Sequence, residues 1–450
     1  MAASCPAVVV GADANGLGVV RSLAKQRITT IVVDTSAPHA AMWSRWARPF
    51  TVSRLYGRPL IDGLLKLQSL IGARAVLILT DEKAVNTVSQ YRRELEQRYR
   101  FHLPPAEMVT TLASKARFHE FAVRHELPVP RTITLGRDSE ITHLAELQFP
   151  VVVKPVDKGA VHLAQAERAS RVGTMEEAEV VCRRMLAAAG QLVAQDWVEG
   201  ADSDIYFALF HCERDASPSV FFGRKIACHP PRVGSTAVCV AAPEAAEPLG
   251  PLVADFVAAS AYEGLGSLEF KRDSRDERFM IIEPTVGRTD WQEEIATLNG
   301  VNLPLIAYCR ELGLPPPPHL SAGRAAAWCE SLRHRKFCSR LDRSVRVHDG
   351  YWRIDDPVPA FAFYAGSALR AARRLVTRLA RLVCGATASG AVSASHISAG
   401  AQRRRTGDWM SHIHSIRVSA AAIWSFSSRR PFLSRSRNSS VVGSSSESMR

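Results

Sequence analysis

A change of pattern near residue 130 constrains the fold of this chain more than any other feature of its sequence. Before it, the apolar runs Ala7–Val10, Thr30–Val33 and Ala75–Thr80 alternate with helical segments, which is typical of a parallel α/β layer. After it, apolar runs follow one another with few helices between them, from Phe149–Pro155 to Arg278–Glu283, and predict antiparallel strands. A chain of 450 residues has room for about two to four domains, so we expect an α/β layer followed by an α+β region.

The net charge of +13 is not spread evenly over the chain. Residues 361–450 hold 14 Arg, no Lys and two acids, so this tail carries +12 and residues 1–360 carry only +1. A nearly neutral body argues against a specific nucleic-acid partner. Residues 361–384 have the period of a basic amphipathic helix, which fits either peripheral membrane contact or docking of its apolar stripe on the body. Residues 385–450 contain 18 Ser and cannot bury a core, so we expect disorder there.

The cysteines and the N-terminus indicate a compartment. The chain has nine cysteines, an odd number, and no CxxC motif, which favours buried thiols in a reducing environment. No charged region precedes the first strand, and no stretch reaches the ~18 apolar residues that a membrane-spanning helix needs. We therefore expect a cytoplasmic protein, with membrane association through residues 361–384 as the open alternative.

A glycine-rich turn joins the first strand to the first helix. Gly11, Gly16 and Gly18 would allow a phosphate to approach a helix N-terminus closely, and Asp34 at the end of the second strand could hold a ribose. The spacing is Gly-x4-Gly-x-Gly rather than the Gly-x-Gly-x-x-Gly of dinucleotide-binding proteins. Two interpretations stay open: a dinucleotide site, or a tight turn that binds no dinucleotide.

Two glutamates are candidates for a metal site. Glu269 and Glu283 lie on two strands at similar distances from the acidic turn Asp273–Glu277, so an antiparallel hairpin would make them cross-strand neighbours. Adjacent carboxylates repel each other unless a cation lies between them, and their hard oxygens suit Mg²⁺ that bridges phosphates. The alternative is a pair of solvated surface acids, which the apolar residues around both glutamates disfavour.

Two further segments carry groups that suit a nucleotide. Lys154 ends an apolar strand and could hold a phosphate, although a lysine at a strand end can also simply extend into solvent. The strand Gln195–Val198 could bind an adenine through its backbone, and Asp202 or Asp204 could accept the ribose hydroxyls.

Together, these features resemble the ATP-grasp superfamily over about residues 7–315. Within it, the chain is similar to the carboxylate–amine ligase group that includes D-aspartate ligase. The motifs that carry this closer resemblance are Gly11–Arg21, Ser114-Lys115, Phe149–Pro155 and Gly223-Arg224-Lys225. The resemblance implies an ATP-grasp fold of mixed α/β and α+β class, with an N-terminal Rossmann-like domain, a small lid subdomain and an antiparallel-sheet core.

The resemblance divides the chain into five segments. The Rossmann-like domain is expected at 1–104, the lid subdomain at 105–194 and the catalytic core at 195–318. A connector and the basic amphipathic helix follow at 319–384, and the Ser/Arg-rich tail occupies 385–450.

The resemblance also implies roles for individual residues. The implied ATP ligands are lysines for the phosphates, hinge residues for the adenine and an acid for the ribose: Lys115, Lys154, Gln195, Val198, and Asp202 or Asp204. The implied Mg²⁺ ligands are Glu269, Glu283 and Thr285. Residues implied to stabilise the phosphoryl group and the oxyanion are Arg224, Lys225 and Arg288.

One part of the pattern departs from the family. Its members usually show Glu-x-Asn-x-Arg on the last strand, whereas this chain has Glu283-Pro-Thr285-Val-Gly-Arg288. The third metal ligand is therefore Thr285 or is absent, and the arginine is displaced by one residue.

The expected activity is that of a ligase that uses ATP and Mg²⁺ to convert a carboxylate into an acyl phosphate and join it to an amine. Its partners would be small-molecule carboxylate and amine substrates, which polar residues at Gly234–Thr236 and Thr289–Glu294 could contact. The chain shows no serine or cysteine nucleophile motif, and this chemistry needs none. Two alternatives stay open: a dinucleotide-dependent oxidoreductase, and a catalytically silent ATP-binding regulatory protein, which Thr285 would suit.

Overall fold

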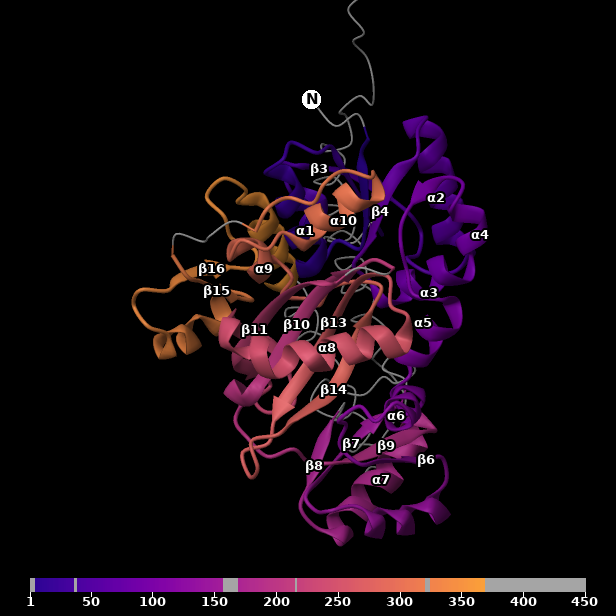
Figure 1. The fold of residues 1–450 in the computed structure, drawn as a ribbon, viewed down its shortest axis with the longest axis vertical. Helices are drawn as coiled ribbons and strands as arrows, with labels where there is room; N and C mark the ends of the chain where they lie inside the picture. The colour runs from indigo at the N-terminus through magenta and orange to yellow at the C-terminus, as the bar shows by residue number, and fades with distance from the viewer. Residues whose placement is uncertain (1–4, 36–38, 157–168, 215–216, 320–323, 369–450) are drawn as a thin grey trace, which may run out of the picture. The chain divides into compact units, whose positions relative to one another are not determined.

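The computed structural model of the chain describes residues 5–35, 39–156, 169–214, 217–319 and 324–368. These residues belong to one compact unit, Met1–Arg373, and a second unit, Arg374–Arg450, lies outside them. Three sheets of five, seven and four strands organise the described part (Figure 1). The predicted amphipathic helix is described only at its start, where residues 358–368 are helical, and the predicted disordered tail lies outside the described residues.

The five-stranded sheet forms the N-terminal layer and is parallel throughout, as its sequence pattern predicts. Its strand order is β3 (Ala47–Thr51), β2 (Thr30–Asp34), β1 (Ala7–Val10), β4 (Ala75–Leu79) and β5 (Tyr99–Arg100). The helices that alternate with these strands are α1 (Ala14–Ala24), α2 (Arg58–Ile71), α3 (Glu82–Gln90) and α4 (Arg92–Leu95). Alternate side chains of β1 pack into two different core clusters, because a parallel strand is buried on both faces.

The seven-stranded sheet forms the core. Its order is β14 (Phe279–Val286), β13 (Gly264–Arg272), β10 (Ile205–Cys212), β11 (Ser219–His229), β12 (Ser235–Ala241), β15 (Ala326–Cys329) and β16 (Arg346–Asp349). The first six strands pair antiparallel, and β15 pairs with β16 in parallel. The segment predicted as a connector, 319–384, therefore contributes two strands to this sheet. The sequence pattern did not indicate these two strands.

One face of the core sheet is covered by α8 (Ala246–Ser260), which lies across β10 and β13 in Figure 1. Leu249, Val253 and Phe256 recur at helical spacing and pack in one cluster with Phe210 and Phe270 of the sheet. The helix includes Pro251. The opposite face of β11 and β13 carries Lys225, Glu269 and Lys271, which line the candidate site described below.

The four-stranded sheet has the order β6 (Thr132–Leu135), β9 (Leu192–Asp196), β7 (Val151–Pro155) and β8 (Ser170–Val172), and α7 (Met175–Ala189) packs on it. Two short helices precede it, α5 (Ala106–Ala113) and α6 (Lys115–Arg124). The Ser114 side chain accepts a hydrogen bond from the Arg117 amide and caps α6, as its position predicts. The predicted boundary between residues 194 and 195 falls inside β9, which pairs with β6 and β7 over its whole length.

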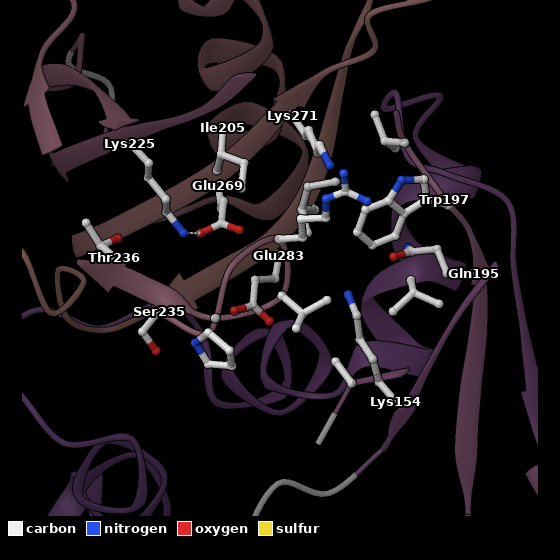
Figure 2. Close-up of a pocket in the computed structure, with 18 of the residues that line it drawn as sticks. Lys154, Gln195, Trp197, Ile205, Lys225, Ser235, Thr236, Glu269, Lys271 and Glu283 are labelled. Carbon is white, nitrogen blue, oxygen red and sulfur yellow. Dashed lines mark hydrogen bonds and ion pairs between the residues drawn. The ribbon is translucent and has the colours of Figure 1, made fainter. Parts of the chain in front are cut away.

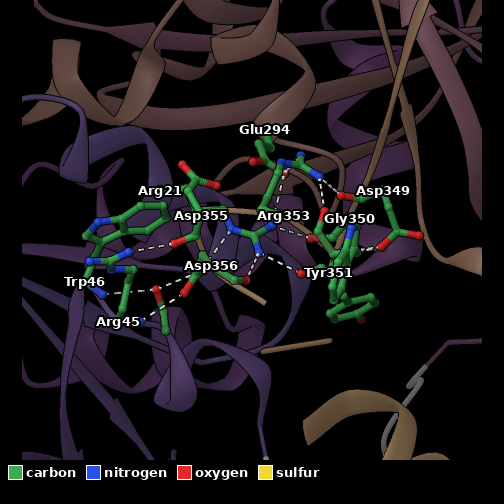
Figure 3. Close-up of polar contacts among 12 residues, drawn as sticks. Arg21, Arg45, Trp46, Glu294, Asp349, Gly350, Tyr351, Arg353, Asp355 and Asp356 are labelled. Atoms are coloured by element: carbon green, nitrogen blue, oxygen red, sulfur yellow. Dashed lines mark hydrogen bonds and ion pairs between the residues drawn. The ribbon is translucent and has the colours of Figure 1, made fainter. Parts of the chain in front are cut away.

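Buried ion pairs connect the segment after β16 to the N-terminal layer (Figure 3). Arg21 of α1 is only 5% exposed and pairs with the fully buried Asp356, with 3.3 Å between Nε and Oδ2. Its guanidinium also donates to the Tyr351 carbonyl at 2.7 Å. Arg353 pairs with Glu294 at 2.8 Å. Residues 349–356 are thus fixed to α1 and to the start of α9 (Glu294–Leu298).

Candidate active site

The two glutamates of the predicted hairpin are cross-strand partners. Glu269 of β13 pairs directly with Glu283 of β14, which confirms the predicted geometry. An irregularity in the register follows Glu269, and it places one extra residue, Ile282, in β14. Both carboxylates line a cavity of about 330 Å³, into which Glu283 points (Figure 2).

Lys225 of β11 fixes the position of one of these carboxylates. Its Nζ lies 2.5 Å from Oε2 of Glu269, and the lysine is only 3% exposed. Burial alone would lower the pKa of Lys225, but the Glu269 carboxylate outweighs it and the pKa is raised above its ordinary value. Lys225 is therefore charged and holds Glu269 by a charge-assisted hydrogen bond.

The opposite wall of the cavity comes from the four-stranded sheet. Lys154 at the end of β7 and Gln195 of β9 both line it, and Figure 2 shows the Lys154 side chain reaching into the cavity from the side opposite Glu269. Val198, just after β9, also lines the cavity. Lys115 at the start of α6 lies beside them and donates from Nζ to the Pro155 carbonyl at 3.1 Å. The structure thus brings together four of the six predicted ATP ligands.

Lys271 of this cavity was not assigned a role from the sequence, and Trp197 was interpreted as core packing. Nζ of Lys271 lies 4.3 Å from the centroid of the Trp197 ring, within the range of a cation–π interaction. Burial lowers the pKa of Lys271. Lys271 lies two residues after Glu269 on the same strand, so the alternation of a β-strand could have placed both on one face.

The two polar segments expected to contact a substrate also meet at this cavity. Ser235 and Thr236 line it together with Asp290 and Gln292. The indole N–H of Trp291 donates to the Thr236 carbonyl at 3.3 Å and joins the two segments. Asp290 is held by its own neighbours, since Oδ1 accepts from the Trp291 amide and Oδ2 from the Gln292 side chain.

A second cavity, of about 640 Å³, adjoins the first. The two share seven lining residues: Lys115, Lys154, Gln195, Ser235, Ile282, Glu283 and Asp290. Thr285 and Arg288 line only this second cavity, whereas Glu269 lines only the first. The predicted third metal ligand is therefore not in the wall that Glu269 and Glu283 share.

Three predicted site residues line neither cavity. Arg224 alternates with Lys225 on β11, and its guanidinium lies 6.0 Å from the ring centroid of its cross-strand partner Tyr206. Asp202 accepts hydrogen bonds from the amides of Cys228 and Arg232, at 2.9 and 2.8 Å. Asp204 accepts from the Ala201 amide and pairs with Arg272. Both carboxylates accept hydrogen bonds from backbone amides. The position of these acids after the strand Gln195–Val198 suggested a ribose site, but it did not distinguish ribose binding from this structural role.

The polar groups of the glycine turn at α1 bind other parts of the chain. Asp34 is 2% exposed and accepts the Ala12 amide at 2.7 Å, so its carboxylate organises the turn itself. Asn15 donates to the Thr289 carbonyl at 2.6 Å. A Cβ at Gly18 would lie 2.7 Å from Oε2 of Glu293, which shows how closely α1 packs on residues 289–294. The helix itself is buried from Ala14 to Leu23, and the dinucleotide interpretation is not supported.

The donor set suits a hard cation with few protein ligands. Among the described residues, no group of three or more His, Cys, Asp and Glu side chains is arranged to hold a metal ion. Glu269 and Glu283 offer two carboxylates, and Mg²⁺ is commonly held by one or two carboxylates together with substrate phosphates and water. Residues of this cavity therefore fit Mg²⁺ that arrives with a nucleotide.

In the described part of the chain, no helix is both long and apolar enough to cross a bilayer.

Comparison with solved structures defines the class of fold. The chain resembles N5-carboxyaminoimidazole synthetase from Staphylococcus aureus in complex with ADP, with a TM-score of 0.58 and 11% identity over 72% of this chain and 81% of that one. It also resembles the biotin carboxylase domain of the Hydrogenobacter thermophilus 2-oxoglutarate carboxylase, with a TM-score of 0.53 and 17% identity over 70% and 71% of the two chains. The chain has the ATP-grasp fold, and this prediction is confirmed.

Sequence comparison adds a more specific relative. The chain is 23% identical over 240 residues to D-aspartate ligase from Enterococcus faecium, which agrees with the resemblance that its motifs indicated. The match covers 51% of this chain and 56% of the relative, so the chain spans little more than half the length of the protein it matches. No protein-family model matches the chain.

Proposed function

We propose that this chain is an ATP- and Mg²⁺-dependent ligase that activates a carboxylate and joins it to an amine. The observation that carries the proposal is the pair Glu269 and Glu283, which faces Lys154 across one cavity. The fold and the relatives support it: two solved neighbours were crystallised with ADP, one of them with magnesium, and D-aspartate ligase is a relative by sequence.

The two walls of the first cavity would hold the nucleotide. Gln195 and Val198 lie where the adenine would bind, and Lys115 and Lys154 would neutralise the phosphates. Asp202, Asp204 and Arg224 have no place in this proposal, because they line neither cavity. Trp197 and Lys271 form a further part of the wall.

Glu269 and Glu283 would be the protein ligands of Mg²⁺. The cation supplies charge neutralisation across the phosphates when it is bound. Lys225 holds the Glu269 carboxylate in place through their ion pair, and Arg288 lies in the adjoining cavity, where it would stabilise charge on the phosphoryl group or the oxyanion. A carboxylate activated as an acyl phosphate is then open to attack by an amine, and no side-chain nucleophile is needed.

Calorimetry on the full chain tests the proposal. ATP should bind in the presence of Mg²⁺, and the Glu283→Gln variant should lose the Mg²⁺ dependence. Asp276→Asn is the matched control, since Asp276 lies exposed in the turn of the same hairpin and pairs with Arg278. Binding of NAD(P)⁺ without binding of ATP would overturn the proposal.

A further inference from the structure

Four large apolar side chains are exposed in the segment that follows β16. Trp352 is 44% exposed, Ile354 91%, Val358 45% and Phe361 64%. The rings of Trp352 and Phe361 meet edge to face, with their centroids 6.0 Å apart. Val358 and Phe361 are three residues apart on one helix and so share a face. We call these four residues the apolar cluster; exposed apolar residues that gather in this way are typical of an interaction surface.

The fold holds the first half of this cluster in the solvent. Asp356 is fully buried and accepts hydrogen bonds from the Ser44 hydroxyl and from the Arg45 amide, both at 3.0 Å (Figure 3). The buried ring of Tyr351 stacks on Phe363, with 3.7 Å between the centroids. The first two members of the cluster lie between these two anchored positions, so their exposure is fixed by buried contacts on both sides.

A basic segment packs beside the cluster. The 3-10 helix Leu332–Arg340 contains no acid and carries four exposed cations: Arg333, Arg335, Lys336 and Arg340. The Leu332 amide donates to the Tyr364 hydroxyl at 2.8 Å, and the Arg333 guanidinium lies 6.0 Å from the centroid of the Phe363 ring. These contacts join the basic segment to the helix that carries Phe361.

Exposed acids are fewer than exposed cations in this part of the chain. Within residues 332–368, six exposed side chains are cationic, since Arg343 and Arg346 add to the four above, and two are acidic, Asp342 and Asp355. The Asp342 carboxylate accepts the Ser344 amide at 2.7 Å. The exposed Arg45 donates to the Asp355 carbonyl at 3.3 Å, so a further cation lies beside the second acid. The surface around the apolar cluster is therefore positive.

The sequence that follows increases this positive charge. Residues 369–384 contain five arginines and no acid. Because the segment Leu332–Arg340 is also basic, repulsion between like charges disfavours residues 369–384 as the cover of the apolar cluster. The partner that fits is both anionic and apolar. A lipid surface has both properties, since anionic headgroups lie directly above acyl chains.

We propose that the apolar cluster and the cations around it bind the surface of a membrane that contains anionic lipids. Ile354 and Phe361 enter the boundary between headgroups and acyl chains, and the amphipathic ring of Trp352 suits the same depth. Arg335 and Lys336 attract the lipid phosphates. This contact goes beyond the proposed ligase activity and does not depend on it.

Co-sedimentation of the full chain with vesicles tests the proposal. The chain should bind phosphatidylcholine vesicles that contain about 30% phosphatidylglycerol at least about tenfold more tightly than vesicles of phosphatidylcholine alone, and high salt should weaken this binding. Ile354→Glu should reduce the affinity at least about fivefold. Val180→Glu is the matched control, because Val180 is a β-branched residue of α7 that is 69% exposed, and this variant should stay within about twofold.

A second pair of variants tests the basic segment. Replacing Arg335 and Lys336 together by glutamine should lower the affinity for the anionic vesicles about threefold or more and make it less sensitive to salt. The control replaces Arg183 and Arg184, two exposed arginines of α7, by glutamine, which changes the net charge equally. Nucleotide affinity should be unchanged in all four variants, which shows that each is folded.

The outcomes separate this proposal from its alternatives. Equal binding to both kinds of vesicle, or binding that Ile354→Glu and Phe361→Ser leave unchanged, overturns the assignment of this surface. Lipid-independent dimerisation that Ile354→Glu abolishes, measured by analytical ultracentrifugation, also overturns it and assigns the cluster to a second copy of the chain. Each result leaves the ligase proposal as it stands, because nucleotide binding is measured separately.

Discussion

The turn Gly11–Gly18 and the hairpin of β13 and β14 both carry polar groups beside apolar strands, but only the hairpin turns them toward a cavity. In the turn, the Asp34 carboxylate accepts the Ala12 amide, and the Asn15 amide donates to the Thr289 carbonyl. In the hairpin, Glu269 and Glu283 line the first cavity, and a buried lysine holds one of them. Residues that look equally suited to a ligand can thus serve packing in one place and binding in the other.

The difference follows from what covers each region. Residues 289–294 pack closely on α1, where Asn15 donates to the Thr289 carbonyl and Gly18 lies against Glu293. The hairpin has no such cover, because the four-stranded sheet stands across a cavity of about 330 Å³ from it. The predictions below test whether the hairpin is functional and the turn structural.

The largest effect on catalytic activity is expected from substitution of Glu283. Glu283→Gln keeps the shape of the side chain and removes a negative charge, so Mg²⁺-dependent ADP formation should fall about 100-fold or more, which corresponds to several kcal/mol of lost charge stabilisation. Steady-state assays of ADP release at saturating Mg²⁺ would measure it. Asp276→Asn should retain full activity, and equal activity of both variants would show that the hairpin carboxylates are structural.

Substitutions of two neighbouring residues of β11 should differ sharply in their effect on nucleotide affinity. Lys225→Met leaves the Glu269 carboxylate without its charged partner, and nucleotide affinity in the presence of Mg²⁺ should fall about tenfold. Arg224→Met should change affinity less than about twofold, because Arg224 lines neither cavity. Titration calorimetry compares the two. A larger loss at Arg224 would contradict the assignment of the two faces of β11.

In the glycine turn, the expected effect is on stability. A Cβ at Gly16 would lie 2.1 Å from the Gly11 carbonyl oxygen, so Gly16→Ala should destabilise the chain by about 1–3 kcal/mol. Gly136→Ala is the control, since the nearest atom to its added Cβ is 3.7 Å away. Denaturant unfolding measures both, and nucleotide affinity of the folded Gly16→Ala protein should be unchanged. Loss of nucleotide affinity without loss of stability would restore the turn as a candidate site.

The last prediction concerns the pH dependence of stability at Glu293, which packs against Gly18. Burial, and then the charge of Glu294, raise the pKa of Glu293 to about 8. The folded chain therefore holds a proton between about pH 4.5 and 8 that the unfolded chain has lost, so the free energy of unfolding should decrease as the pH rises through this window. The slope is at most about 1.4 kcal/mol per pH unit. Glu293→Gln should flatten it in thermal unfolding at pH 5 to 8, and an unchanged slope would show that Glu293 does not titrate in this window.

Much of the site was predictable because it follows from local periodicity. The distances of Glu269 and Glu283 from one turn gave their pairing, and the apolar run before Lys154 placed that residue near the end of a strand. Strand alternation could also have predicted the place of Lys271, because it lies two positions along the same strand from Glu269. The parallel order of the N-terminal layer followed from the alternation of strands and helices.

The sequence pattern by itself indicated a parallel α/β layer followed by antiparallel strands, and the cross-strand pair of glutamates, since alternation and turn position are local properties of the chain. The ATP-grasp fold and the roles of the lysines came from the family resemblance. Only the tertiary structure decided that Asp202 and Asp204 bind backbone amides, that Arg224 lies on the far side of β11, and that 326–349 adds two strands to the core sheet. These outcomes depend on contacts between residues distant in sequence. A carboxylate has the same local pattern whether its partner is a ligand or a backbone amide, and only folding brings that partner into reach.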